Sequence, residues 1–589
     1  MKRKSIIISV IIIVSGLFLL FLISGGLHSK SHIIRKIYSY LSFYSEGQNY
    51  YSKRSGNWSS RSVWKGDQPS YTISQGDTVF IDHNISFPGN LTINGVLYVG
   101  ESGSLINDGN KDIVVSSGAA VIVYGNLQCI NFQADSNTNL KIYGSLEVQG
   151  NFANSGTIVV ETGDTKTGSL NIQGNISGNR NITFKRKISA DGWHYISSPV
   201  ENAPVTVVSG GALYSYNEAE KSWRKHQSGE TFQTLKGYDV YFKNADRTIV
   251  FNGNMHHGSY IANLTNTESG GDGYNLTGNP YPSAIDWDAS GWTKSNAGTT
   301  IYIWDASIQN ITTYTTGIGG TNGGTNIIPP TMAFFVQCTS NSGGQLVFSN
   351  SVRVSTVADF RGTTAENLFT LKVSGAGFSD ETAINFNEAA EEKYNPANDA
   401  IKMFSYNENV PQIFTRSGDA RNLAVNSLPL DTRGLDLPLY FSAGVSGPYK
   451  ITAVQKDFFI NNHVFLEDKN TKETIDLSTG DYTFETEAVK QYQRFILHFR
   501  PQEQVFSADN RLESKEIKVW SSGKNILIQQ NLPEENTEIR VYSLKGQEIY
   551  SGKLPVQAKT SISFNKPAGI YLVRISKNEV TYNYEIFIP

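Results

Sequence analysis

Two acidic residues separated by one position, Asp286 and Asp288, have the residue types and the spacing that could serve a metal ion. On a strand, positions i and i+2 share one face, and on a loop two such carboxylates could help to bind calcium. The competing interpretation is that both acids flank a packed Trp287. Calcium is the only cofactor that the sequence suggests, since cysteine and histidine show no metal-ligand spacing.

A second group of residues has the chemistry of a sugar-binding surface. An aromatic face stacks on the apolar face of a pyranose ring, and Trp287, Trp292 and Trp304 lie close together in the sequence. Asn279 and Tyr281 precede them in a stiff Asn-Pro-Tyr-Pro turn. These five residues are our candidate glycan contacts, and burial of the aromatic rings in a core is the alternative. The loops that carry this prediction are residues 279–304 and 317–326.

Signals for catalysis are missing from the sequence. It contains no nucleophile elbow, no phosphate-binding loop, no His-Glu-x-x-His and no cysteine–histidine pair. Polysaccharide hydrolases and lyases need paired carboxylates, or calcium-binding carboxylates beside a basic residue, on one surface. The acids of residues 51–186 are scattered, with neither Asp-Asp nor Asp-x-Asp among them. We therefore predict a protein that is not an enzyme, with a carbohydrate-active enzyme as the alternative.

Composition bounds the class of protein. The 589 residues carry a formal net charge of −3, which gives no basic surface for nucleic acid. The chain is rich in Gly, Tyr and Phe, which is typical of strands joined by tight turns. Cys129 and Cys338 are its two cysteines, so a disulfide scaffold is excluded and both are expected to be buried thiols. We predict an all-β protein of several domains.

The amino terminus predicts export. Three basic residues at 2–4 precede an apolar run over residues 6–23, and small residues follow at 24–26. This order is that of a secretory signal peptide, which we assign to residues 1–26. An uncleaved membrane anchor is the alternative, because the run is long enough to span a bilayer. Residues 27–50 are expected to be a linker.

Residues 51–186 repeat one short phrase, a glycine turn followed by Leu or Ile and then alternating apolar positions. Examples are residues 103–105, 125–127 and 144–146. Copies 19 to 30 residues apart indicate stacked coils that bury their apolar faces against one another. We predict a short right-handed parallel β-helix, with a β-sandwich of irregular hairpins as the alternative.

The start of this region contains Ser55-Gly56-Asn57-Trp58 and then Trp64. In these residues it resembles G8-like β-helical domains of extracellular proteins, some of which are linked to polysaccharides. The competing interpretation is that Trp58 and Trp64 cap the open end of the solenoid.

Residues 187–360 contain an internal duplication. Four strand-like phrases recur in the same order, beginning at 192 and 273, 213 and 301, 237 and 333, and 248 and 345. The offset grows along the chain, as expected when loops take the insertions. We predict two equivalent sets of strands in a sandwich. The phrases resemble a module of large secreted proteins from Bacteroidetes-type bacteria. A further β-sandwich is expected over residues 361–500, followed by a polar linker at 501–515.

The last segment, residues 516–589, alternates as a small sandwich of strands with turns at Gly546 and Gly569. Gly569 begins the phrase Gly-Ile-Tyr-Leu-Val-Arg-Ile, which includes Tyr571. These motifs resemble the type A C-terminal sorting domain of the type IX secretion system. The resemblance implies an Ig-like fold, passage through the type IX translocon, removal by a sortase-like cysteine protease, and attachment at the outer-membrane surface. The chain departs from that family in its apolar last residues, 586–589.

Together these observations predict a secreted, surface-displayed protein without catalytic activity, an adhesin or a protein that contacts a glycan. Its expected partners are the type IX translocon, the sortase-like protease, and a surface polysaccharide or a host or matrix glycan. A purely structural stalk is a further alternative.

Overall fold

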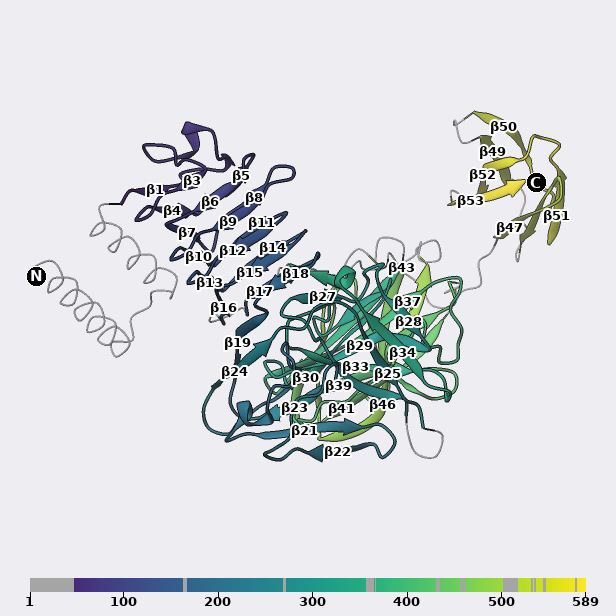
Figure 1. Cartoon of the computed structure of the whole chain (residues 1–589). Helices are drawn as coiled ribbons and strands as arrows, with labels where there is room; N and C mark the ends of the chain where they lie inside the picture. The colour runs from purple at the N-terminus through teal and green to yellow at the C-terminus, as the bar shows by residue number, and fades with distance from the viewer. Residues whose placement is uncertain are drawn as a thin grey trace, which may run out of the picture. The chain divides into compact units, whose positions relative to one another are not determined.

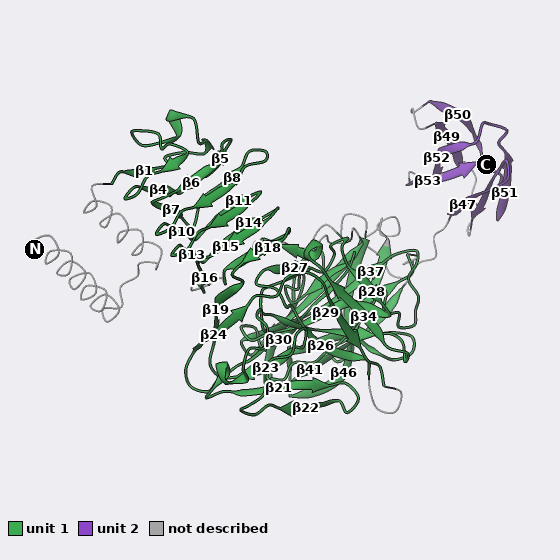
Figure 2. Cartoon of the chain, viewed as in Figure 1, with its two compact units in different colours: residues 1–502 green, residues 503–589 purple. Residues whose placement is uncertain are grey.

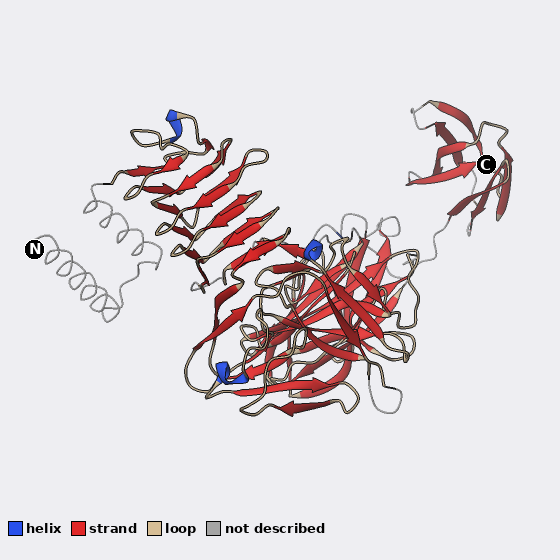
Figure 3. Cartoon of the chain, in the orientation of Figure 1, coloured by secondary structure: helices blue, strands red, loops and turns tan. Residues whose placement is uncertain are grey.

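The computed structural model describes residues 47–501 and 517–588, apart from residues 163–166, 268–271, 356–364, 366, 431–434, 456–457, 459–461, 531–532, 534–536, 544–546 and 578–579. The expected signal peptide, the linker at 501–515 beyond its first residue, and Gly546 lie outside these residues. The chain forms two compact units, residues 1–502 and 503–589 (Figure 2). Strands and short 3-10 helices make up the regular structure of the described residues, which confirms the predicted all-β class (Figure 3). None of their helices is long and apolar enough to cross a membrane.

The first part of the chain is a parallel β-solenoid, as predicted (Figure 1). Its strands follow one another in triplets, with one strand in each of three sheets. The first sheet contains β1 (Asn49–Tyr51), β4 (Thr78–Ile81), β7 (Val96–Val99), β10 (Ala120–Val123), β13 (Asn139–Ile142), β16 (Thr157–Val160) and β19 (Asn181–Ile188). The second contains β2 (Gly56–Asn57), β5 (Asn84–Phe87), β8 (Ser104–Asn107), β11 (Asn126–Cys129), β14 (Ser145–Val148) and β17 (Ser169–Ile172). The third contains β3 (Thr72–Ile73), β6 (Leu91–Ile93), β9 (Ile113–Val115), β12 (Phe132–Ala134), β15 (Phe152–Asn154) and β18 (Ile176–Gly178).

The alternation of residue types explains why these strands stack. In β13, Leu140 and Ile142 face the core, while Asn139 and Lys141 face outward. The same residues pair in register with the strands on either side, so apolar rows run along the inside of the solenoid. Buried Trp58 and Trp64 close the amino-terminal end, with their rings 5.1 Å apart, as the capping interpretation expected.

Glycines at the corner between the first and second sheets are required by space. Gly103, Gly125 and Gly144 are stacked in successive coils, and none of them has a positive φ. A Cβ atom on Gly125 would overlap the carbonyl oxygens of Gly103 and Gly100. The repeated glycine phrase therefore marks where neighbouring coils approach most closely.

Gly125→Ala tests this explanation. The new methyl group meets backbone atoms that cannot rotate away, so we expect a loss of about 2–3 kcal/mol in stability. Differential scanning calorimetry of the purified protein should show a lower midpoint. Gly480→Ala is the matched control, because a Cβ atom added at Gly480 would have no neighbour within 4 Å and its φ is not positive. Equal midpoints for the two variants would contradict the close-approach explanation.

A ladder of side-chain hydrogen bonds supports the corner between the second and third sheets, directly before β9, β12, β15 and β18. Asp112 Oδ1 accepts from the Asn131 backbone N–H at 3.1 Å, and Asn131 Oδ1 accepts from the Asn151 N–H at 2.8 Å. Asn151 Oδ1 continues the ladder to the Asn175 N–H at 3.3 Å. Each side chain satisfies a backbone donor of the next coil at this solvent-facing turn. This ladder was not predicted, although an Asn or Asp directly before an apolar strand residue marks it in the sequence.

The solenoid has no linker at its carboxyl end. Its last strand, β19, pairs antiparallel with β24 (Arg247–Asn254) along all eight residues. The boundary expected between residues 186 and 187 therefore falls inside a strand that the solenoid and the next domain share.

The duplication predicted for residues 187–360 is visible in the strand order. The first repeat has a sheet of β20 (Trp193–Ile196), β23 (Tyr238–Tyr241), β21 (Ala212–Asn217) and β22 (Ser222–Lys225). The second has β26 (Tyr274–Gly278), β33 (Ala333–Cys338), β29 (Ala297–Asp305), β30 (Asn310–Thr315) and β31 (Gly319–Thr321) in the same order. The β19–β24 pair of the first repeat corresponds to β25 (Tyr260–Leu264), β34 (Gly344–Phe348) and β28 (Thr293–Ser295).

The two repeats pair with each other through equivalent contacts. The Ser197 N–H donates to the Thr331 carbonyl at 2.9 Å, and the equivalent Gly278 N–H donates to the Leu235 carbonyl at 2.8 Å. Leu235 and Thr331 both have positive φ, at 64° and 60°. Such self-complementary contacts are those of a twofold dimer, here built within one chain.

A small sheet joins the second repeat to the solenoid. It contains β27 (Ala284–Asp286), β32 (Ile327–Ile328) and β35 (Arg353–Val354). Buried Arg353 donates from Nη1 to the Ile172 carbonyl and from Nη2 to the Leu170 carbonyl, both at 2.9 Å. The guanidinium therefore ties the second repeat to β17.

Residues 368–501 form the third part of unit 1. Rings from distant strands meet in its core: Phe484 lies 5.3 Å from Phe441 and 5.0 Å from Phe495. The sheet therefore closes over its own apolar face, as expected for a sandwich. Its strands are β36 (Leu368–Gly375), β37 (Phe378–Phe386), β38 (Ala400–Ile401), β39 (Gln412–Arg416), β40 (Asn422–Leu428), β41 (Asp436–Ala443), β42 (Gly447–Ala453), β43 (Asn462–Asp468), β44 (Glu473–Asp476), β45 (Tyr482–Thr486) and β46 (Val489–Pro501).

Unit 2 is a small sandwich with its own core, which includes Ile528, Val541, Val573 and Ile588. One sheet contains β47 (Ile517–Ser522), β48 (Asn525–Gln530) and β51 (Lys559–Ser563). The other contains β50 (Glu548–Lys553), β49 (Glu538–Ser543), β52 (Gly569–Lys577) and β53 (Val580–Ile588).

Candidate binding grooves

Asn279 and Tyr281, two of the predicted glycan contacts, are fully buried. Asn279 Nδ2 donates to the Ser283 and Pro329 carbonyls at 2.8 and 2.9 Å, and its Oδ1 accepts from the Tyr281 N–H. The Tyr281 hydroxyl donates to the Gly258 carbonyl at 2.6 Å. Both side chains shape a turn and are not available to a ligand.

Trp287 and Trp292 do not offer free faces for a sugar either. Trp287 is 0 % exposed, and Lys294 Nζ lies 3.5 Å from the centroid of its ring. Lys294 Nζ also donates to the Trp287 carbonyl at 2.7 Å. Burial lowers the pKa of Lys294 to about 8, although Asp288 and Asp286 act in the opposite direction. Half-buried Trp292 donates from Nε1 to the Asp286 carbonyl at 2.7 Å, so this cluster is a cation–π core.

The carboxylates of Asp286 and Asp288 are engaged by protein donors. Asp286 Oδ1 accepts from Asn326 Nδ2 at 2.6 Å and from the Asp288 N–H at 2.8 Å. Asp288 Oδ2 accepts from the Tyr314 hydroxyl. Across the described ranges, no three His, Cys, Asp or Glu residues are grouped as a metal site would need. The pair acts as a hydrogen-bonding hub of the turn, and its calcium role stays a prediction.

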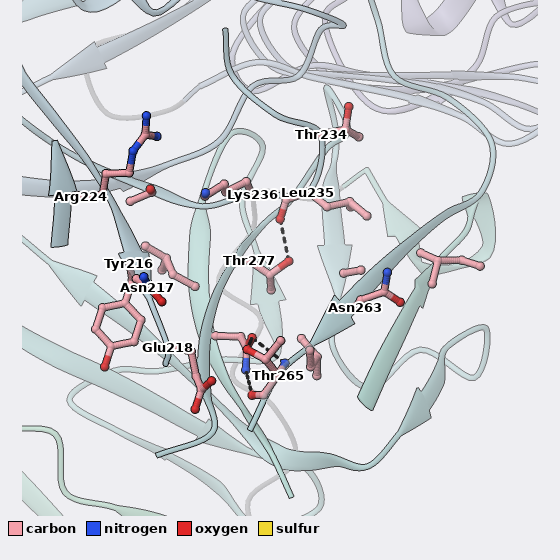
Figure 4. Close-up of a pocket in the computed structure, with 16 residues that line it drawn as sticks. Tyr216, Asn217, Glu218, Arg224, Thr234, Leu235, Lys236, Asn263, Thr265 and Thr277 are labelled. Atoms are coloured by element: carbon pink, nitrogen blue, oxygen red, sulfur yellow. Dashed lines mark hydrogen bonds between the residues drawn. The ribbon is translucent and has the colours of Figure 1, made fainter. Parts of the chain in front are cut away.

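Two equivalent grooves lie where the repeats meet. The first, with a volume of about 480 Å³, runs between the β21–β22 hairpin of the first repeat and strands β25 and β26 of the second (Figure 4). The second, of about 330 Å³, lies between β29 and β30 of the second repeat and strands β19 and β20 of the first. Each groove is formed by equivalent strands with the roles of the two repeats interchanged. The internal twofold relation therefore produces both grooves.

The first groove has polar walls. Tyr216, Lys236 and Asn263 line it, and the only acid among its lining residues is Glu218 (Figure 4). Burial alone would raise the pKa of Glu218, but the Thr267 and Gly273 N–H groups donate to the carboxylate and hold it below its usual value. Burial, with Arg224 nearby, lowers the pKa of Lys236. The anchored carboxylate thus fixes a wall of the groove.

The second groove contains Trp304, the remaining predicted glycan contact, together with residues 323–325 of the predicted loop 317–326. Trp304 is 5 % exposed, and its ring packs 4.8 Å from Tyr406. Arg186, His194 and Asp305 also line this groove. Arg186 and Glu218 were not among the predicted site residues. Glu218 directly follows β21, which is one of the recurring phrases, whereas Arg186 lies in β19, before the first recurring phrase.

A third cavity, of about 450 Å³, lies at the junction of β16, β19 and β24. Its lining consists of Gly, Thr, Asn and Ile residues, without a carboxylate. The first and second grooves have one carboxylic acid each. None of these three described cavities therefore has the pair of carboxylates that glycoside hydrolysis uses.

In unit 2, the predicted motif residues have structural roles. Buried Tyr571 donates its hydroxyl to the Pro567 carbonyl at 2.8 Å, and its ring lies 5.0 Å from that of Phe564. Gly569 begins β52. Cys129 and Cys338 are buried free thiols, as predicted.

Comparison with known proteins gives two family matches. Residues 50–499 match the family described as "Domain of unknown function (DUF8693)", and residues 522–588 match the "Secretion system C-terminal sorting domain". No curated protein matches the sequence.

Two solved structures show weak similarity. One is titled "Biofilm associated protein - BSP domain", with 9% identity, a TM-score of 0.13, and coverage of 70% of this chain and 91% of that chain. The other is "The Bacillus anthracis TIE protein", with 10% identity, a TM-score of 0.08, and coverage of 69% of each chain. Scores this low do not establish a shared fold.

Proposed function

Because the chain belongs to the DUF8693 family over residues 50–499 and ends in a secretion system C-terminal sorting domain, we propose that it is a non-catalytic adhesin that contacts a glycan through the grooves between its repeats. The sorting domain indicates export by type IX secretion to the cell surface. The removal of this domain by a sortase-like protease and a surface or matrix glycan as the ligand are parts of the proposal.

The observation that carries the proposal is the pair of equivalent grooves. Hydroxyl-bearing side chains in both linings suit the hydroxyl groups of a saccharide, and twofold repetition gives one chain two places to hold a polymer. The absence of paired carboxylates from the three described cavities favours binding over hydrolysis. The Trp287 cluster has no part in this proposal, since its rings are packed.

A glycan array tests the proposal. The purified protein is expected to bind a restricted set of saccharides, and the double substitution of Lys236 and Asn263 by alanine should weaken binding to the first groove at least tenfold. Lys393→Ala is the matched control, because Lys393 is exposed and lies outside all three cavities. An array without any bound saccharide, or ligands turned over into shorter products, would overturn the proposal.

A further inference from the structure

We propose that the second groove binds the carboxylate of an acidic saccharide, with Arg186 as the residue that anchors it. This inference deepens the proposed function, since it rests on a glycan-contacting groove and assigns a chemical class to one of the two. It is carried by the burial, the placement and the hydrogen bonds of Arg186.

Arg186 is a buried cation without an acidic partner. Its side chain belongs to β19, lines the groove, and the residue is 8 % exposed. Nη1 donates to the Thr331 carbonyl at 2.5 Å and to the Thr331 hydroxyl at 2.8 Å, and Nη2 lies 3.8 Å from Met332 Sδ. Within the described part of the chain, no carboxylate forms an ion pair with it. Burying a charge without a counter-charge is costly, so a bound anion would be favoured here.

Arg353 shows what a purely structural buried arginine looks like in this protein. It also has no acidic partner among the described residues, but Nε donates to Ser283 Oγ, and Nη1 and Nη2 donate to the Ile172 and Leu170 carbonyls, all at 2.9 Å. Its guanidinium also packs 4.8 Å from the Tyr281 ring centroid. Arg353 lines none of the three cavities. Arg186 differs because it faces a cavity, has no described acceptor at Nε, and meets only a thioether sulfur at Nη2.

The rest of the second groove suits a sugar rather than a peptide. Hydroxyl groups of Ser189, Ser307, Thr312 and Thr325 line it, beside the His194 imidazole. Burial, and next Arg186, lowers the pKa of His194 to about 4, so the imidazole is neutral at pH 7 and Arg186 is the cation of the groove. Asp305 is the one acid in the lining, and its Oδ1 accepts from the Ser307 N–H and hydroxyl. Asp305 Oδ2 can accept a sugar hydroxyl.

The first groove provides an internal comparison. Arg186 lies opposite Ile249 on β24, and the equivalent residue opposite Leu346 on β34 is Ala262. Glu218 of the first groove corresponds in turn to Ala306 of the second. The two grooves therefore share one backbone plan but differ in their charged residues: Glu218 lies with Arg224 and Lys236 in the first, and Arg186 lies with Asp305 in the second. We infer that the second groove selects acidic saccharides through Arg186.

The test compares acidic and neutral ligands. An array that holds uronate, sialate and matched neutral oligosaccharides is probed with the full protein, followed by isothermal titration with trigalacturonate, galactotriose and hexaglutamate peptide. We expect at least one carboxylated saccharide to bind tenfold or more tightly than its neutral counterpart. Arg186→Gln should abolish that preference, and Arg186→Lys should retain part of it, because lysine keeps the charge without the planar fork.

Ala306→Glu is the second variant and leaves Arg186 in place. It puts a carboxylate at the position equivalent to Glu218 and should also remove the acidic preference. The thermal unfolding midpoint of each variant checks that it is folded. Because the unpaired charge of Arg186 destabilises the folded state, Arg186→Gln should lower the midpoint by no more than a few degrees. Neutral ligands bound as tightly as acidic ones would overturn this inference while leaving the proposed function intact. Tighter binding of hexaglutamate than of any saccharide would overturn the saccharide assignment.

Discussion

Asp380→Ala is expected to destabilise unit 1 by about 3–5 kcal/mol, because it leaves the buried ammonium of Lys402 without a counter-charge. Asp380 is fully buried, and Lys402 Nζ donates to its Oδ1 and Oδ2 at 2.6 and 2.5 Å. Asn310 and Asn322 donate to Oδ1 at 2.9 and 3.0 Å, and the Ile413 N–H donates to Oδ2 at 2.7 Å. One carboxylate therefore joins the third part of unit 1 to the second repeat.

Denaturant unfolding followed by tryptophan fluorescence measures this effect. The matched control is Asp481→Ala, which removes an exposed ion pair with Lys450 and should change stability by less than about 1 kcal/mol. The double variant Asp380→Leu with Lys402→Met should recover part of the loss, since it no longer buries a lone charge. A single Asp380→Ala variant as stable as the control would contradict the role assigned to this pair.

The second large effect concerns display at the cell surface. Val541→Asp should reduce the amount of protein on the surface of cells to near the level seen after deletion of residues 516–589. Val541 is fully buried, pairs with Val573 across β49 and β52, and belongs to the core of unit 2. A buried, unpaired carboxylate at this position would unfold the small sandwich that the secretion machinery recognises.

Val556→Asp provides the same substitution at an exposed position, since Val556 is 57% exposed. Surface proteomics of intact cells, with whole-cell extracts for comparison, should show normal display of this control. Unit 1 has separate cores and should remain folded in both variants, so that it accumulates inside the cell when sorting fails. Normal surface display of Val541→Asp would mean that the folded sandwich is not the sorting signal.

The sequence predicts well those features that a local pattern encodes. Period-two alternation and a repeated corner glycine predict the solenoid. Phrases that recur in the same order with growing offsets predict the duplication. Each signal lies within a few residues of the structure that it specifies. The Gly-Ile-Tyr-Leu-Val-Arg-Ile phrase that suggested a sorting domain is likewise a single strand, β52.

The binding grooves depend on contacts that no local pattern encodes. Arg186 and Thr331 form a hydrogen bond although 145 residues separate them in the sequence. The residues next to either one do not predict this contact. The aromatic residues Trp287 and Trp292 could have been a platform or a core with the same spacing, and Lys294 decides between the two by covering Trp287. Composition thus predicts which side chains can bind a sugar, while the pairing of the repeats decides which of them face a cavity.

The strand that the solenoid shares with the first repeat has a mechanical consequence. Tension between the tip of the solenoid and the grooves passes through the β19–β24 ladder and the Arg353 contacts with β17 instead of a flexible connection. With strands about 4.8 Å apart, the step from β1 to β19 spans roughly 29 Å. The solenoid is therefore a lever arm of fixed length, and its tip cannot swing freely when a ligand pulls on the molecule.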